Sequence, residues 1–163
     1  MKSLCEKGKG QILKDAFIED DEILEMAVAR EVDAIKFYTV LAESARDSNM
    51  RRMFEELAAE EMEHKAKLEL EIMKTGRVVD TQRRPTGFND DKAGYVPPEV
   101  DIDYKGILSI GLQKEDASFR LYMDLAGMIN DPRSRDMLVA LAQEEAEHKL
   151  RFQTELERIA ESE

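Results

Sequence analysis

Cysteine occurs once in this sequence, at Cys5, so no disulfide can form within the chain and no group of cysteines can hold a metal ion. Tryptophan is absent and glycine occupies only 8 of 163 positions, as is typical of a helical chain rich in alanine, glutamate, lysine, leucine and arginine. No apolar run approaches the roughly 20 residues of a membrane span, and the first residues contain no apolar segment typical of a signal peptide. We therefore expect a cytoplasmic protein that does not engage a membrane.

Acidic residues strongly outnumber basic ones. The chain has 24 Lys and Arg against 36 Asp and Glu, which gives a formal net charge of −12 and an isoelectric point near 4.8. Such a surface repels the phosphates of nucleic acids and anionic membranes, so neither is an expected partner. The length suits a single domain with one hydrophobic core.

Helical periodicity defines the expected architecture. Apolar residues recur at intervals of three and four in four segments, which predicts an all-α protein with helices over about residues 20–47, 49–75, 103–130 and 132–160. Residues 76–102 hold three of the four prolines and show no helical period, which indicates a long crossover connection. Such a crossover lets the second and third helices run parallel. We thus expect an N-terminal arm over residues 1–19 and one four-helix bundle over residues 20–163.

An internal repeat appears at an offset of 84 residues. The matched positions include Glu31 with Glu115, Tyr38 with Tyr122, Asp47 with Asp131, and the stretch Glu60-Glu61-x-Glu63-His64-Lys65 with Glu144-Glu145-x-Glu147-His148-Lys149. The chain is therefore predicted to be a duplicated helical hairpin. Two similar hairpins should pack around a pseudo-two-fold axis, across which matching residues meet.

Six polar residues fall on the helix faces that should pack inward: Glu31, Glu61, His64, Glu115, Glu145 and His148. Four carboxylates at one depth of a core repel each other strongly unless divalent cations neutralise them. Glu and His three residues apart point the same way on a helix, so each Glu-x-x-His pair can bind one metal ion. Bundles with two metal ions combine two such pairs with one Glu from each of the other two helices. The pattern predicts a two-metal site whose ligand types allow iron, manganese or zinc. The alternative is a bundle that satisfies these groups by hydrogen bonds alone.

Other polar residues lie close to these motifs. Tyr38 and Tyr122 each follow the upstream Glu by two helical turns, so we expect their hydroxyls to donate a hydrogen bond to a ligating carboxylate, with plain core packing as the alternative. Four further glutamates are expected on solvated helix faces: Glu60, Glu63, Glu144 and Glu147. Among them, Glu144 lies four residues before His148, and its role as an additional ligand stays open.

At these motifs the sequence resembles the rubrerythrin-type di-iron domain of the ferritin-like superfamily, over about residues 20–160. The similarity is carried by residues 29–38 and 53–64 of the first hairpin and by residues 112–122 and 141–148 of the second. The resemblance implies a ferritin-like four-helix bundle that binds two iron ions. It also implies the ligand roles, with Glu31 and Glu115 as terminal carboxylates, Glu61 and Glu145 as bridging carboxylates, and His64 and His148 as the nitrogen ligands.

Two features differ from complete rubrerythrins. Those proteins carry a rubredoxin domain with four cysteines, whereas this chain has one, so the resemblance implies an external electron donor such as a rubredoxin-like protein. They also carry an additional Glu one turn after the third-helix ligand, where this sequence has Ser118. In this respect the site resembles the symmetric type of ferroxidases.

The resemblance implies an oxidoreductase of the oxidative stress response, in which two Fe(II) ions reduce hydrogen peroxide or O₂. Two alternatives stay open. One is a ferroxidase or iron-handling protein with Fe(II) as substrate, for which storage would require a shell of many subunits, whereas we expect a homodimer. The other is a non-catalytic bundle that holds zinc, manganese or no metal.

Overall fold

The computed structural model describes residues 18–76, 79 and 103–163. Within these ranges the chain forms four helices and no strand: α2 (Asp20–Ser44), α3 (Ser48–Met73), α4 (Tyr104–Met128) and α5 (Pro132–Ser162). The expected all-α four-helix bundle is confirmed, although α2, α3 and α4 end at residues 44, 73 and 128 rather than near 47, 75 and 130. Nearly all of the predicted arm and crossover lies outside the described residues. None of the described helices has the length and hydrophobicity required to span a membrane.

Aspartate side chains begin three of the helices. Asp47 accepts hydrogen bonds from the backbone N–H groups of Asn49 and Met50 at 2.8 and 3.0 Å, so it satisfies two donors that have no partner within α3. Asp131 does the same for Ser134 at 2.9 Å, and Asp103 accepts from Gly106 at 2.8 Å. These caps are the local signals that end each loop and start the next helix.

The duplication is visible in the hydrogen bonds of the two hairpin turns. Arg51 donates from Nη2 to the carbonyl oxygen of Ala45 at 3.2 Å, and Arg135 donates from Nη2 to the carbonyl oxygen of Ile129 at 3.0 Å. Both pairs are related by the offset of 84 residues. The two hairpins therefore share their turn geometry as well as their sequence.

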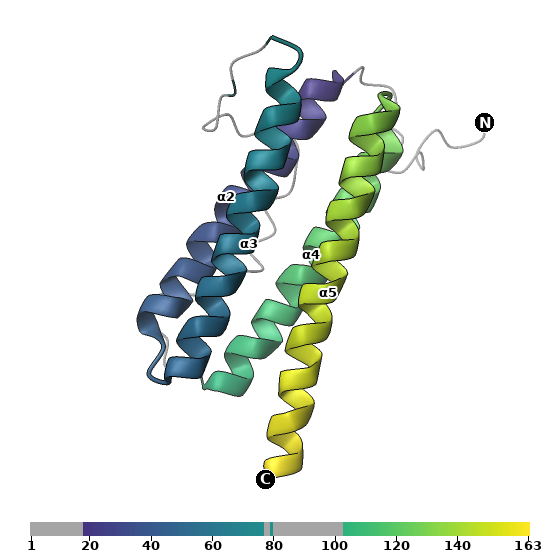
Figure 1. Cartoon of the computed structure of the whole chain (residues 1–163). Helices are drawn as coiled ribbons and strands as arrows, with labels where there is room; N and C mark the ends of the chain where they lie inside the picture. The colour runs from purple at the N-terminus through teal and green to yellow at the C-terminus, as the bar shows by residue number, and fades with distance from the viewer. Residues whose placement is uncertain (1–17, 77–78, 80–102) are drawn as a thin grey trace, which may run out of the picture.

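The four helices form two hairpins. The helix α2 packs against α3, and α4 packs against α5, with sparser contacts between α2 and α4 and between α3 and α5. In Figure 1, α3 and α4 both begin at the lower end of the molecule, so they run parallel. This is the arrangement for which a long crossover is required.

The core has two apolar clusters, one toward each end of the bundle. The Leu141 cluster is Ile23, Leu24, Ala27, Val28, Leu68, Ile72, Tyr122, Leu125, Ala126, Ile129, Leu138, Leu141 and Ala142. The Phe152 cluster is Ala34, Phe37, Tyr38, Leu41, Ala42, Phe54, Leu57, Ala58, Leu108 and Phe152. Along every helix, the positions between these two clusters are the predicted polar residues of the inward face. The bundle is therefore apolar at both ends and polar in the middle.

Candidate metal centre

The middle of the bundle is a polar layer of six buried side chains: Glu31 from α2, Glu61 and His64 from α3, Glu115 from α4, and Glu145 and His148 from α5. Each is 2% exposed or less. These are the six residues that the sequence pattern selects as metal ligands, and the structure brings all of them together. Their helical spacing aims them at one layer because residues three or four apart lie on the same helix face.

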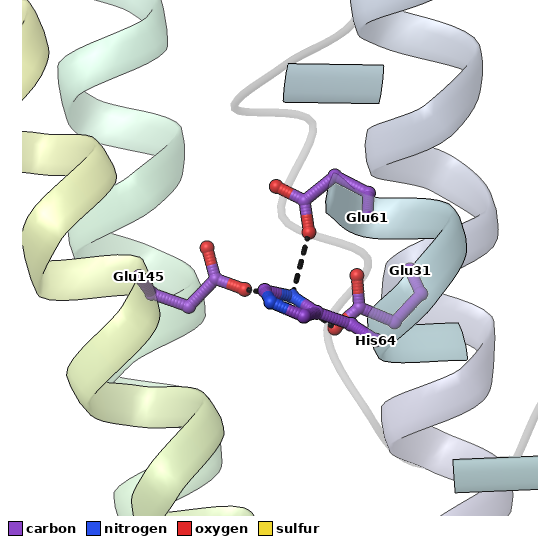
Figure 2. A group of neighbouring side chains, drawn as sticks. All are labelled: Glu31, Glu61, His64 and Glu145. Atoms are coloured by element: carbon purple, nitrogen blue, oxygen red, sulfur yellow. Dashed lines mark hydrogen bonds and ion pairs between the residues drawn. The ribbon is translucent and has the colours of Figure 1, made fainter. Parts of the chain in front are cut away.

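The polar layer divides into two groups of potential ligands. The first is Glu31, Glu61, His64 and Glu145, and the second is Glu61, Glu115, Glu145 and His148. In each group, one ligand atom from every residue lies within 4.8 Å of the others. Glu61 and Glu145 belong to both groups, which is the arrangement predicted for carboxylates that bridge two ions. Figure 2 shows the first group, in which Glu145 reaches across from the second hairpin toward the imidazole of His64.

Both imidazole rings present the same nitrogen to the centre. The Nδ1 atom of His64 lies 3.1 Å from Glu61 Oε2, 3.3 Å from Glu145 Oε1 and 3.6 Å from Glu31 Oε1. The Nδ1 atom of His148 lies 3.3 Å from an oxygen of Glu61, 3.3 Å from an oxygen of Glu145 and 3.7 Å from Glu115 Oε2. The rings are nearly parallel, with centroids 5.8 Å apart.

Several buried polar atoms of this layer make no hydrogen bond within the described part of the chain. They are Glu31 Oε2, Glu61 Oε1, Glu145 Oε2 and His148 Nδ1. A buried polar atom without a partner destabilises a fold by about 1–3 kcal/mol, so an arrangement of this kind calls for a ligand. Carboxylate oxygens with one imidazole nitrogen per group are donors that suit a divalent metal ion, and the residues present therefore fit two ions.

Burial and mutual contact shift the pKa values of the groups in the polar layer. Burial, together with the charges of Glu61 and Glu145, raises the pKa of Glu31 well above its usual range, although the nearby imidazole of His64 opposes the shift. Burial likewise raises the pKa of Glu115. For Glu61 and Glu145 burial acts in the same direction, but the close approach of both imidazole rings outweighs it and lowers the pKa of each carboxyl. Hydrogen bonds with these carboxylates overcome burial and raise the pKa of His64 to about 12. These shifts show that the layer favours additional positive charge, as protons or as metal ions.

The two tyrosines of the repeat differ in their contacts. The Tyr122 hydroxyl donates to Glu31 Oε1, a carboxylate of the other hairpin rather than Glu115 of its own helix. The Tyr38 hydroxyl makes no hydrogen bond to any described residue, and its ring stacks between Phe54 and Phe152 at centroid distances of 6.3 and 6.2 Å. One tyrosine therefore contacts the polar layer, and the other packs in the Phe152 cluster.

Glu60 and Glu144 are partly exposed and belong to neither group of potential ligands, but each also contacts a buried histidine of the layer. Glu60 Oε2 accepts a hydrogen bond from His148 Nε2 at 2.6 Å, and Glu144 Oε2 accepts one from His64 Nε2 at 2.7 Å. Glu144 therefore contacts the histidine of the other hairpin and is not among the grouped ligands. The neighbouring Glu63 and Glu147 are exposed, as expected. In the sequence, the only indication of a shared role for Glu60 and Glu144 is that they occupy matched positions in the repeat.

Ser118 occupies the position one turn after Glu115. It is buried, and its hydroxyl accepts a hydrogen bond from Arg30 Nε at 2.9 Å. The same guanidinium donates to the carbonyl oxygen of Lys114 at 3.1 Å. Because Ser118 is neutral and its hydroxyl is hydrogen-bonded to the Arg30 guanidinium, this position adds no carboxylate to the polar layer.

The comparison with protein families decides the classification. The profile of the family described as Rubrerythrin matches residues 22–156, which include all four helices almost entirely. The chain belongs to the Rubrerythrin family. Members of this ferritin-like family usually bind two iron ions, and the buried carboxylate and histidine groups of this member could hold a metal.

Solved structures agree with this assignment at the level of the fold. A hypothetical protein from Pyrococcus furiosus superposes with a TM-score of 0.69 at 23% identity, covering 93% of this chain and 97% of that one. A dodecameric thioferritin from Bacteroides fragilis, described as a bacterioferritin-related protein, superposes with a TM-score of 0.61 at 21% identity, covering 88% and 89%. No curated protein matches this member of the Rubrerythrin family. The four-helix bundle is therefore ferritin-like.

Proposed function

We propose that the chain is a di-iron carboxylate oxidoreductase of the cytoplasm that reduces hydrogen peroxide or O₂ with electrons from an external donor. One observation carries the proposal. Two buried groups of three carboxylates and one imidazole share Glu61 and Glu145, within a chain of the Rubrerythrin family. Carboxylates shared in this way would hold two metal ions that act together on one small molecule.

The six residues of the polar layer have distinct proposed roles. Glu31 and His64 would hold one ion and Glu115 and His148 the other, while Glu61 and Glu145 would bridge both. When bound as Fe(II), the two ions would supply the two electrons that cleavage of an O–O bond requires.

The protein surroundings support this chemistry. Tyr122 fixes the orientation of the Glu31 carboxylate by donating a hydrogen bond to one of its oxygens. The Leu141 cluster and the Phe152 cluster cover the layer from both sides with apolar side chains. A dry environment strengthens the attraction between the carboxylates and bound cations.

The test is peroxide consumption by iron-loaded, chemically reduced protein. Glu61→Ala should abolish it, because Glu61 belongs to both ligand groups. Glu63→Ala is the matched control, since Glu63 is exposed two residues away on α3, and it should keep the wild-type rate. Full activity of Glu61→Ala would refute the proposal. Elemental analysis of anaerobically purified protein tests the metal, and zinc or manganese in place of iron would favour the non-catalytic alternative.

The electron source and the assembly are further parts of the proposal. We propose a rubredoxin-like donor outside these 163 residues, because their single cysteine cannot hold a rubredoxin-type iron. We also propose a homodimer as the functional unit. Mass determination by light scattering measures the assembly directly.

A ferroxidase or iron-handling role is the second candidate. The paired ligand groups with Ser118 in place of an additional carboxylate favour it, and so does the similarity in fold to a protein described as a dodecameric thioferritin. A closed shell that takes up many Fe(II) ions per chain would support this role. A dimer that binds two ions and consumes peroxide would support the oxidoreductase.

A further inference from the structure

The two hairpins exchange hydrogen bonds at their histidines. Glu60 lies four residues before His64 on α3, a spacing at which side chains of one helix commonly pair. It nevertheless binds His148 of α5, across the bundle. Glu144 of α5, four residues before His148, binds His64 of α3 in the same way. Each carboxylate thus serves the histidine of the opposite hairpin.

A basic residue completes each pair. Arg151 follows His148 by three residues and donates from Nη1 to Glu60 Oε1 at 2.9 Å, leaving Oε2 for the imidazole. Lys67 follows His64 by three residues and contacts Glu144 Oε1 at 3.4 Å, again leaving Oε2 for the imidazole. The two arrangements are related by the offset of 84 residues. A contact that recurs at matched positions in both halves, with a basic residue each time, is a property of the repeat rather than an isolated surface pair.

Each of these carboxylates connects the surface to the centre. The side chains of Glu60 and Glu144 are 43% and 41% exposed, whereas the histidines that they bind are almost fully buried. Because a carboxylate can only accept, the hydrogen bond places a proton on Nε2 of the ring. The Nδ1 atom of the same ring faces three carboxylates of the polar layer. An imidazole that binds metal through Nδ1 must carry its proton on Nε2.

We propose that Glu60 and Glu144 are positioning residues that hold His148 and His64 with Nδ1 turned toward the metal positions, each across the bundle. This inference rests on the proposed metal site and adds a second set of residues to it. The hydrogen bond fixes both the ring orientation and the proton position, and the basic partner keeps the carboxylate from turning away. Metal positions that depend on such partners typically lose 10- to 100-fold in affinity when the partner is removed, on the order of the loss we expect here.

The crossed pairing can be tested by nitrogen NMR of protein labelled at histidine. The chain has only two histidines, so the spectrum contains two imidazoles. In the metal-free protein, Glu60→Ala should change the ring signals of His148 more than those of His64, and Glu144→Ala should do the reverse. The opposite assignment, with each carboxylate affecting the histidine of its own helix, would overturn the proposal.

Zinc titration tests the effect on metal binding. Each alanine variant should lose about 10- to 100-fold in zinc affinity at one of the two metal positions. In the wild type with Zn(II) bound, both histidine rings should carry their proton on Nε2. Glu60→Gln and Glu144→Gln should recover most of the loss, because an amide oxygen still accepts the hydrogen bond. Glutamine variants as weak as alanine variants would overturn positioning by a hydrogen bond.

Matched controls separate positioning from surface charge. Glu63→Ala and Glu147→Ala remove the same charge next to the same histidines, from exposed side chains. They should bind zinc as the wild type does, and an equal loss in these controls would overturn the proposal. A wild-type protein that binds no zinc would refute the proposed metal site. The crossed pairing is tested separately, by the histidine ring signals of the metal-free protein.

Discussion

Two glycines of α4 offer a matched pair of substitutions with opposite expected effects on stability. A Cβ atom at Gly111 would lie 2.8, 2.9 and 3.2 Å from three atoms of the Phe152 ring. At Gly127, on the same helix, it would meet nothing within 4 Å. The same change of residue therefore meets a ring at one position and open space at the other.

The magnitudes follow from two competing effects. Glycine to alanine inside a helix stabilises by about 0.5–1 kcal/mol, because alanine loses less backbone entropy on folding. Overpacking a well-filled core destabilises by about 1–3 kcal/mol. The Phe152 ring is fully buried and stacked on Tyr38, so it has little room to move. We expect Gly111→Ala to lower the free energy of unfolding by about 0.5–2 kcal/mol and Gly127→Ala to raise it by about 0.4–1 kcal/mol.

Urea unfolding of the metal-free protein, followed by circular dichroism, measures both changes by linear extrapolation. The backbone contribution is common to the two variants, so their difference isolates the clash. Phe152→Leu should relieve that clash, and the double variant with Gly111→Ala should therefore lose less stability than the sum of the single changes. Equal stabilisation by both alanine substitutions would refute the packing argument.

Two further predictions concern the polar layer. Tyr122→Phe should destabilise the metal-free protein by about 1–3 kcal/mol in the same unfolding assay, because it removes the hydrogen-bond donor to Glu31. Tyr38→Phe is the control: it removes a hydroxyl that has no partner among the described residues, so it should not destabilise the protein. Metal binding should release protons, because carboxylate partners raise the pKa of His64 to about 12, so its ring is protonated at neutral pH and must lose a proton to bind metal through Nδ1. Burial raises the pKa of Glu31 and Glu115, which acts in the same direction. Zinc affinity should consequently fall as the pH decreases, by about tenfold per pH unit for each proton displaced. Calorimetry in buffers of different ionisation enthalpy counts the protons, and a count of zero would contradict the shifts.

The polar layer was predictable from the sequence because helical periodicity and the repeat constrain it together. A glutamate such as Glu31 in the middle of an apolar stripe has no solvated alternative once the helix packs by that stripe. The repeat then requires an equivalent residue, Glu115, at the same depth. Helix type and inward face depend on local spacing alone, and a single sequence contains that information.

Contacts between the hairpins could not be predicted in the same way. Sequence spacing gives Glu60 a partner on its own helix, and only the distance and register between α3 and α5 show that His148 is the partner instead. The difference between Tyr38 and Tyr122 has the same origin. The two residues are equivalent in the repeat, but their hydroxyls lie in different surroundings once the hairpins have packed.

The sharing of Glu61 and Glu145 has a consequence for how the molecule comes apart. Each ligand group takes three residues from one hairpin and one from the other, so an ion in either group would tie the hairpins together. Contacts within each hairpin are extensive, whereas those between the hairpins are sparse. Metal loading would therefore slow amide hydrogen exchange most for openings that separate the hairpins, and least for fraying within one of them. In such a protein the supply of metal would determine how often the two hairpins separate.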